Sequence, residues 1–214
     1  MKKLMATAAA VVFLAVAGTA HADSFGFTKI TNNGNTDISS QLWVDVVVGT
    51  HGFPVDFVFH NNGPVESSIT DIYFDDGTLL GLAGITNGTG VSFDDPANPS
   101  NLPGGNLATP PFVTTSGLSA DSDAPIIQKG VNPGEFVIIS FTLKSGGVFQ
   151  DVIDELNSGD LRIGLHVQAI APQGGSDSYI NEGEGTPHET PEPGTLILFG
   201  TGLVGLGLMR RRKR

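Results

Sequence analysis

The segment that decides the fold is residues 40–60, which read SQLWVDVVVGTHGFPVDFVFH. All even-numbered positions from Leu42 to Val48 are apolar, and a period of two places them on one face of a β-strand. Residues 49–54 are rich in glycine and proline, the residue types that mark turns. Because a second apolar segment follows at residues 55–60, the stretch predicts a β-hairpin.

Further strands are expected on both sides of a long loop. Residues 69–74 alternate again and predict a third strand of an antiparallel meander. Residues 94–111 are dense in Pro, Asn and Gly and cannot sustain a strand, because Pro removes backbone donors. Residues 136–143 predict a central strand buried on both faces, because the run is continuously apolar. Residues 161–169 alternate, which predicts one more strand.

One helix and one edge strand complete the expected elements. Phe149, Val152, Ile153 and Leu156 recur at helical spacing and predict a short amphipathic helix that ends at Gly159. An edge strand is expected near residues 179–180.

Together, seven or eight short strands and one helix predict an all-β fold. The expected architecture is an antiparallel β-sandwich or jelly roll over residues 23–173. An acidic, glycine-rich stalk is expected over residues 174–190. The 214 residues contain no cysteine, which excludes a disulfide-stapled scaffold and a metal site with cysteine ligands.

Charge is distributed unevenly along the chain. The whole sequence has a formal net charge of −11, but its basic residues cluster at both ends. Residues 23–190 hold four basic against 21 acidic residues. Such a surface repels phosphate backbones, because nucleic-acid binding needs clustered Lys and Arg. The composition therefore excludes nucleic acid as a partner.

The N-terminus has the three parts of a secretory signal peptide. Two lysines open it, an apolar stretch follows over residues 4–17, and an A-x-A cleavage site lies at Ala20 and Ala22. We expect residues 1–22 to be removed during export by the general secretion machinery, so that the mature chain begins at Asp23. An N-terminal anchor helix or a buried strand is the alternative.

The C-terminus combines a short polar motif, an apolar run and a basic tail, in that order. They are Pro191, Glu192, Pro193 and Gly194; residues 195–209; and Arg210, Arg211, Arg212, Lys213 and Arg214. A helix of 15 residues spans about 22 Å, which is short for a hydrocarbon core of about 30 Å. The run therefore predicts a marginal transmembrane helix, with the basic tail on the cytoplasmic side.

The same apolar run contains a G-x-G-x-x-G pattern at residues 200–205. Too few residues follow it for a dinucleotide-binding unit. Nucleotide binding is therefore excluded.

This three-part terminus resembles the PEP-CTERM sorting signal of exosortase substrates in Gram-negative bacteria. The resemblance covers residues 191–214 and implies that a membrane-embedded exosortase recognises Pro191-Glu192-Pro193 and cuts nearby. The chain would be anchored transiently in the inner membrane and then released or transferred to the cell surface. A permanent single-pass anchor is the alternative.

The central domain also resembles a recurring ectodomain type among such surface proteins. The matching stretches are residues 67–77, 101–105, 120–123, 132–134 and 161–168. This resemblance implies a single domain and adds no established activity.

Catalytic signals are sparse. No histidine lies in H-E-x-x-H and no serine lies in G-x-S-x-G. A triad is defined in space rather than along the chain, so His166 with Asp71 or Asp121 is one candidate site. A carboxylate pair for glycoside hydrolysis, drawn from Asp71, Asp75 or Asp151, is another.

Three acidic clusters lie in expected turns or loops, where calcium finds oxygen ligands. The candidate calcium ligands are Asp75, Asp76, Asp94, Asp95, Asp121 and Asp123. Acidic loops that keep an exported domain soluble are the alternative.

Three function classes follow. The first is a noncatalytic surface or extracellular-matrix protein that is processed by exosortase and acts by adhesion or association with exopolysaccharide. The second is a calcium-assisted carbohydrate-binding module, with Trp43 or Tyr73 as contact residues; core packing explains these two aromatics equally well. The third is an exported hydrolase.

Overall fold

The computed structural model describes residues 22–34, 36–50, 52–181 and 183. These residues form ten strands, two short α-helices and two short 3₁₀ helices. The strands are β1 Ala22–Lys29, β2 Leu42–Val48, β3 Val55–Asn61, β4 Ser68–Asp75, β5 Leu80–Asn87, β6 Phe93–Asp94, β7 Ser119–Ser122, β8 Glu135–Leu143, β9 Arg162–Ile170 and β10 Gly175–Asn181. The helices are α1 Ile126–Lys129, α2 Phe149–Ser158, η1 Ser39–Gln41 and η2 Gly105–Leu107.

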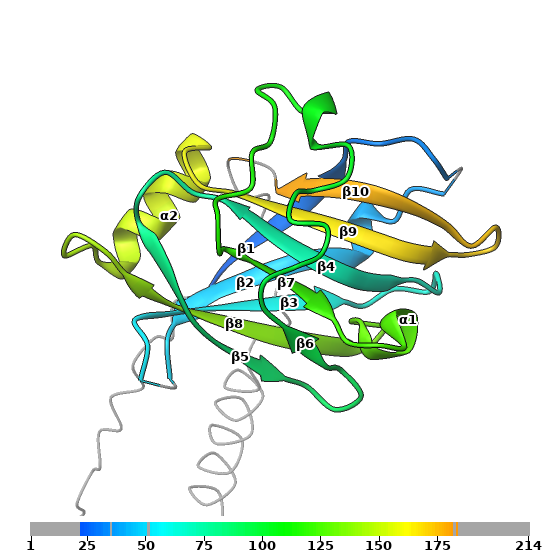
Figure 1. Cartoon of the computed structure of the whole chain (residues 1–214), viewed down its shortest axis with the longest axis horizontal. Helices are drawn as coiled ribbons and strands as arrows, with labels where there is room; N and C mark the ends of the chain where they lie inside the picture. The colour runs from blue at the N-terminus through cyan, green and yellow to red at the C-terminus, as the bar shows by residue number, and fades with distance from the viewer. Residues whose placement is uncertain (1–21, 35, 51, 182, 184–214) are drawn as a thin grey trace, which may run out of the picture.

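All ten strands belong to one sheet, in the order β5-β8-β3-β2-β1-β10-β9-β4-β7-β6. Figure 1 shows this sheet curled into a half-barrel, with α2 at one end and α1 at the other. The prediction of an antiparallel all-β domain is confirmed. Its finer form, a sandwich of two separate sheets with one helix, differs from the structure, which has one continuous sheet and two helices.

The sheet is continuous because β1 is shared between its two halves. Residues 22–26 pair with β2, and residues 27–29 pair with β10. The inner faces of the two halves meet around Phe74 of β4, whose ring lies 5.4 Å from that of Phe57 in β3 and 4.7 Å from that of Phe141 in β8. These edge-to-face contacts lie within the main hydrophobic core.

The predicted hairpin is confirmed, and the predicted meander is wrong. β2 pairs with β3 in antiparallel register, from Leu42 opposite Asn61 to Val48 opposite Val55. β4 then crosses to the other half of the sheet and pairs with β9 and β7. A turn signal shows where a chain reverses, but it does not determine which strand lies beside the next one.

The predicted amphipathic helix is α2. Val152, Ile153 and Leu156 are buried, which is the apolar face that the spacing indicates. Gly159 ends the helix with φ = 80°, in the left-handed region where glycine is favoured. The four-residue helix α1 was not predicted, because it is too short to show a period.

Two expected strands differ from the prediction, one in its position and the other in its burial. β10 lies between β1 and β9 and is therefore not an edge strand. It also occupies most of the first half of the expected stalk; residues 182 and 184–190 of that stalk lie outside the described residues. β8 is central, as predicted, but only its inner face is fully buried, since Phe136 on its outer face is 40% exposed.

The expected loop covers the outer face of β4 and β9 as a strap over residues 95–113. Its apolar side chains form a second, smaller core with Tyr73 of β4, made of Ala97, Leu102, Ala108 and Phe112. Gly164 of β9 permits this close packing, because a Cβ there would lie 2.7 Å from Leu102 Cδ2 and 3.1 Å from Phe112 Cζ. The strap thus resembles compact surface loops that are packed by their own side chains.

Candidate functional site

Cross-strand pairing brings the predicted pair His166 and Asp71 together on the outer face. His166 in β9 is opposite Asp71 in β4, and Asp71 is opposite Asp121 in β7. The Nδ1 atom of His166 lies 2.9 Å from Asp71 Oδ2. Asp94 in β6 is in turn opposite Asp121, so three aspartates and one histidine form a row across four strands, hereafter the acid row.

The strap packs beside this row, and its backbone makes hydrogen bonds there. The Asn98 N–H donates to Asp121 Oδ2 at 3.1 Å, and the Tyr73 hydroxyl donates to the Pro99 carbonyl at 3.0 Å. Burial raises the pKa of Asp121, and the neighbouring charges of Asp71 and Asp123 raise it further, although hydrogen bonds from the backbone oppose the change. Burial, followed by the charge of Asp71, likewise raises the pKa of Tyr73.

A second anchor holds the far end of the strap. Arg162 forms an ion pair with Asp75 and donates to the carbonyls of Pro110 and Pro111 at 2.7 and 2.8 Å. Its guanidinium also lies 5.4 Å from the centre of the Phe112 ring. Hydrogen bonds thus hold the strap at both ends. Within the acid row, the side chain of Asp71 is 7% exposed, whereas Asp94 at the end of the row is exposed.

The six candidate calcium ligands do not form one site, although Asp94 and Asp121 are cross-strand neighbours. Asp76 is buried and accepts hydrogen bonds from the amides of Leu79 and Leu80. Asp123 accepts one from Ser92 at 2.7 Å, and Asp94 accepts one from the amide of Asp95 at 2.9 Å. Within the described part of the chain, no group of three or more His, Cys, Asp or Glu side chains is arranged to hold a metal ion. The carboxylates of Asp76, Asp94 and Asp123 instead stabilise turns and strands.

Aromatic side chains form a second row on the outer face of the other half of the sheet. Trp43 of β2, His60 of β3 and Phe136 of β8 are cross-strand neighbours. The rings of Trp43 and His60 stack with centroids 4.8 Å apart at 16°, and those of His60 and Phe136 lie 6.3 Å apart. Tyr73, the other aromatic predicted to contact sugar, is instead buried under the strap.

Asp45 joins this aromatic row to β1. Its carboxylate lies 3.2 Å from His60 Nε2 and accepts hydrogen bonds from Ser24 and from Trp43 Nε1. Burial opposes ionisation of Asp45, but the hydrogen bonds and the charge of His60 outweigh burial, so its pKa is lowered. The row thus combines the exposed ring of Phe136 and the half-buried rings of Trp43 and His60 with one fixed acceptor. Ligand sites commonly combine apolar surface with a few placed polar groups.

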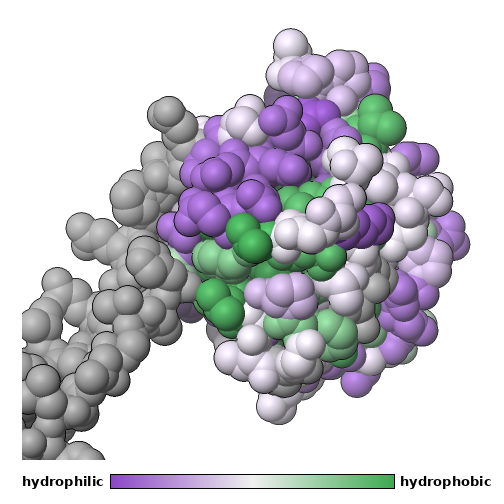
Figure 2. All heavy atoms as spheres, turned by 90° about the vertical axis from the view of Figure 1, so that its left-hand side faces the viewer, coloured by the Kyte–Doolittle hydropathy of each residue, from purple (hydrophilic) through white to green (hydrophobic). Residues whose placement is uncertain are grey.

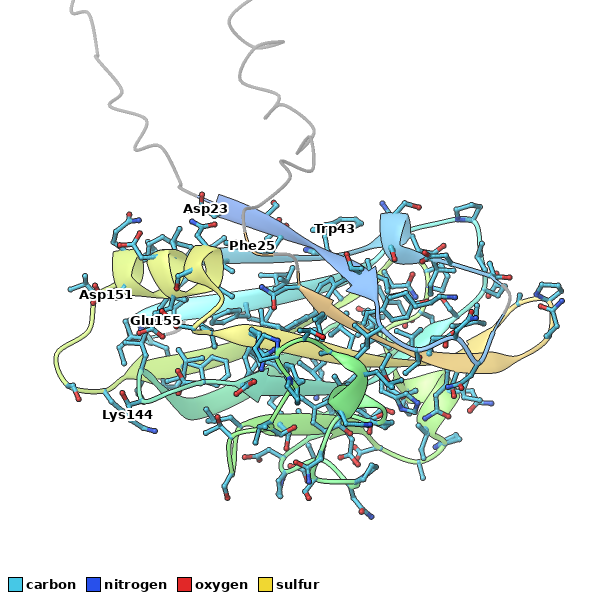
Figure 3. The ribbon with its side chains drawn as sticks, turned by 90° about the horizontal axis from the view of Figure 1, so that it is seen from above. Asp23, Phe25, Trp43, Lys144, Asp151 and Glu155 are labelled. Atoms are coloured by element: carbon cyan, nitrogen blue, oxygen red, sulfur yellow. The ribbon has the colours of Figure 1, made fainter. Side chains whose placement is uncertain are left out.

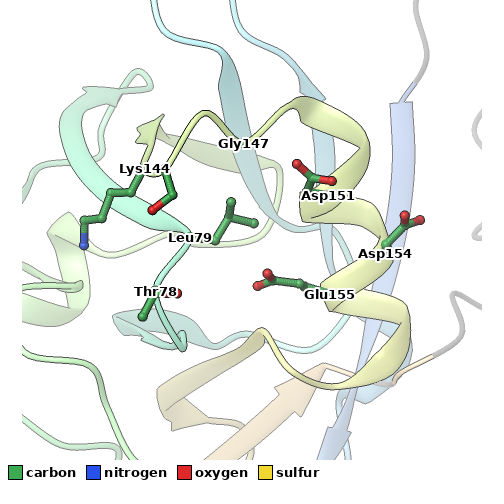
Figure 4. Close-up of a pocket in the computed structure, with 8 residues that line it drawn as sticks. Thr78, Leu79, Lys144, Gly147, Asp151, Asp154 and Glu155 are labelled. Carbon is green, nitrogen blue, oxygen red and sulfur yellow. The ribbon is translucent and has the colours of Figure 1, made fainter.

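A pocket of about 320 Å³ lies at the end of the half-barrel that carries α2. Its lining includes Leu79, Lys144, Asp151, Asp154 and Glu155. Figure 4 shows Glu155 reaching from α2 toward Leu79, while Lys144 points away from the helix. Burial, followed by the charges of nearby aspartates, raises the pKa of Glu155.

No helix among the described residues has the length and apolarity needed to cross a membrane. The predicted signal-cleavage residue Ala20, the sorting residues 191–194 and the basic residues 210–214 lie outside the described residues. Ala22 begins β1.

Comparison with known proteins identifies the C-terminal segment. A family model described as the PEP-CTERM protein-sorting motif matches residues 189–213. The chain carries a PEP-CTERM sorting motif. Searches of curated proteins and of solved structures found no match. The motif marks an exosortase substrate and implies export and a cell-surface location.

Proposed function

We propose that this protein is a noncatalytic component of the cell surface or extracellular matrix that associates with exopolysaccharide after exosortase processing. The sorting motif supports delivery to the surface. The observation that carries the proposed role is the aromatic row of Trp43, His60 and Phe136, because an open sheet face with aligned aromatics and a fixed carboxylate suits a sugar polymer.

The charge of the domain narrows the class of polysaccharide. Residues 23–190 carry 21 acidic and four basic residues, so acidic polymers are repelled at low salt. A neutral or amino-containing polysaccharide is therefore the preferred partner. Direct binding is favoured over the calcium-assisted form, because the described aspartates hold turns and strands rather than one common site.

The binding experiment uses the exported protein and the exopolysaccharide isolated from the same culture, with chitin and cellulose as comparison polymers. We expect the protein to sediment with the polymer, and Phe136→Ala to reduce the bound fraction several-fold. Thr86→Ala is the matched control, because Thr86 is exposed on the same sheet face but lies outside the aromatic row. Equal binding by both variants would show that the aromatic row does not bind the polymer.

One observation favours the hydrolase alternative, namely the contact of 2.9 Å between His166 and Asp71. The pocket at α2 does not include either residue. Release of reducing ends from the same polymers measures turnover. Turnover that is lost in His166→Gln would assign the acid row to catalysis and overturn the noncatalytic proposal.

A further inference from the structure

Both ends of the described chain lie at the end of the half-barrel that carries α2. β10 runs toward the start of β1, since Asn181 is opposite Phe27. Gly183 passes the last turn of α2, because a Cβ on Gly183 would lie 3.2 Å from the Asn157 carbonyl oxygen. Figure 3 shows Asp23, near the start of β1, beside α2. The chain therefore leaves the domain next to this helix.

The sorting motif follows at a short distance along the chain. It begins at residue 189, so only residues 184–188 separate it from Gly183. Eight residues lead from Gly183 to Pro191, and even a fully extended chain of that length spans no more than about 28 Å. An enzyme that binds the motif must therefore approach the α2 end of the domain closely.

The surface at this end has a distinct chemistry. The outward side of α2 is polar and acidic, with Asp151, Asp154 and Asn157 exposed. Two exposed valines, Val48 and Val148, lie at the same end. Figure 2 shows this end with hydrophilic residues gathered above a smaller group of hydrophobic ones.

The geometry points to a docking contact: the outward face of α2 binds a basic surface of the exosortase while the enzyme holds the sorting motif. The short connection supplies proximity, because a tethered partner is present at a high effective concentration. The exposed carboxylates supply charge complementarity to basic side chains of the enzyme. Anionic lipid headgroups would repel the same face, so the enzyme rather than the membrane is the partner.

The test measures how fast the full-length precursor is shortened in cells that contain exosortase. The docking variant combines Asp154→Arg with Asn157→Arg on the exposed face of α2. The matched control combines Glu66→Arg with Asn62→Arg, which make the same change of charge at exposed positions beyond β3, at the opposite end of the domain. We expect the docking variant to be processed several times more slowly, and the control to be processed like the wild type.

A second form of the chain, with a longer linker, distinguishes the loss of docking from a general defect in processing. An insert of about 15 Gly and Ser residues after Gly183 lets the enzyme reach the motif without touching the domain. With this insert, the docking variant and the otherwise unchanged chain are expected to be processed at the same rate.

Three results would overturn the docking contact. They are processing of the docking variant at the wild-type rate, equal slowing of the control, and persistence of the defect with the insert. Faster processing of the docking variant would instead indicate that the face meets anionic lipid. Polysaccharide binding plays no part in this experiment, so failure of the proposed function leaves the docking contact unaffected.

Discussion

At the residue scale, ionisable side chains on the outer face contribute to stability in opposite ways. Asp121 in the acid row is partly buried beside Asp71 and Asp123, which raises its pKa. Asp45, which contacts the aromatic row, is surrounded by donors, and these lower its pKa. The two positions therefore predict opposite dependences of stability on pH.

For Asp121, the folded state favours the protonated carboxyl. Stability is then lost as the pH rises from the ordinary pKa of 3.8 through the raised folded value. We expect Asp121→Asn to unfold at a higher temperature than the wild type at pH 7, and the gain to diminish near pH 3. The measurement is thermal unfolding at both pH values; a less stable variant at pH 7 would contradict the expectation.

For Asp45, the folded state favours the ionised carboxylate. Its contribution is present above the ordinary pKa of 3.8 and is lost as the pH falls through the lowered folded value. We expect Asp45→Asn to be destabilised at pH 7, and the difference from the wild type to shrink below pH 3. Urea unfolding can be followed by the fluorescence of Trp43, the single tryptophan; a difference that does not change with pH would exclude this role.

At the element scale, the strap depends on the missing side chain of Gly164. A Cβ at this position meets the ends of Leu102 and Phe112 within 3.1 Å, and both side chains are buried in the second core. We expect Gly164→Ala to destabilise the protein by about 1–3 kcal/mol, the usual cost of overpacking.

Hydrogen exchange distinguishes a local effect of Gly164→Ala from a global one. Amides of residues 96–113 should exchange faster in the variant, while those of β8 keep their protection. Unchanged exchange in the strap would show that its packing does not depend on this glycine.

The buried face of α2 allows a second prediction about stability. Here the substitution removes a buried side chain, whereas Gly164→Ala adds one where there is no space. Leu156 is fully buried in the main core, and truncation to alanine removes apolar surface and leaves a cavity. We expect Leu156→Ala to lower the free energy of unfolding by about 2–5 kcal/mol, as measured by urea unfolding. Asn157→Ala, on the exposed side of the same helix, should change stability little; equal effects would contradict the assignment of faces.

At the scale of the whole molecule, the last strand completes the sheet. β10 joins β1 to β9 and therefore connects the two halves of the sheet. A chain that ends at residue 173, where the sequence places the end of the domain, lacks β10. We expect it to fail to fold, whereas a chain that ends at residue 183 folds. Resistance to protease and far-UV circular dichroism of both chains provide the check; a stable domain ending at 173 would refute the role of β10.

Local patterns predicted several elements correctly because their signals lie within a few residues. The hairpin of β2 and β3 follows from alternation and an intervening turn, and α2 follows from its apolar spacing and Gly159. The pairing of His166 with Asp71 was also among the candidates from sequence. The aromatic row had only a partial signal, Trp43, because its other members come from strands that are far apart in the sequence.

What the sequence by itself determined is the C-terminal sorting motif, the antiparallel β class and the single amphipathic helix. Each depends on short-range order: a fixed series of residues, a period of two, or a period near 3.6. Tertiary structure alone decided that β1 is shared between the halves, that β10 is central and that Tyr73 is buried under the strap. These features depend on which distant segments pair and which side chains fill the space between them, and no local pattern contains that information.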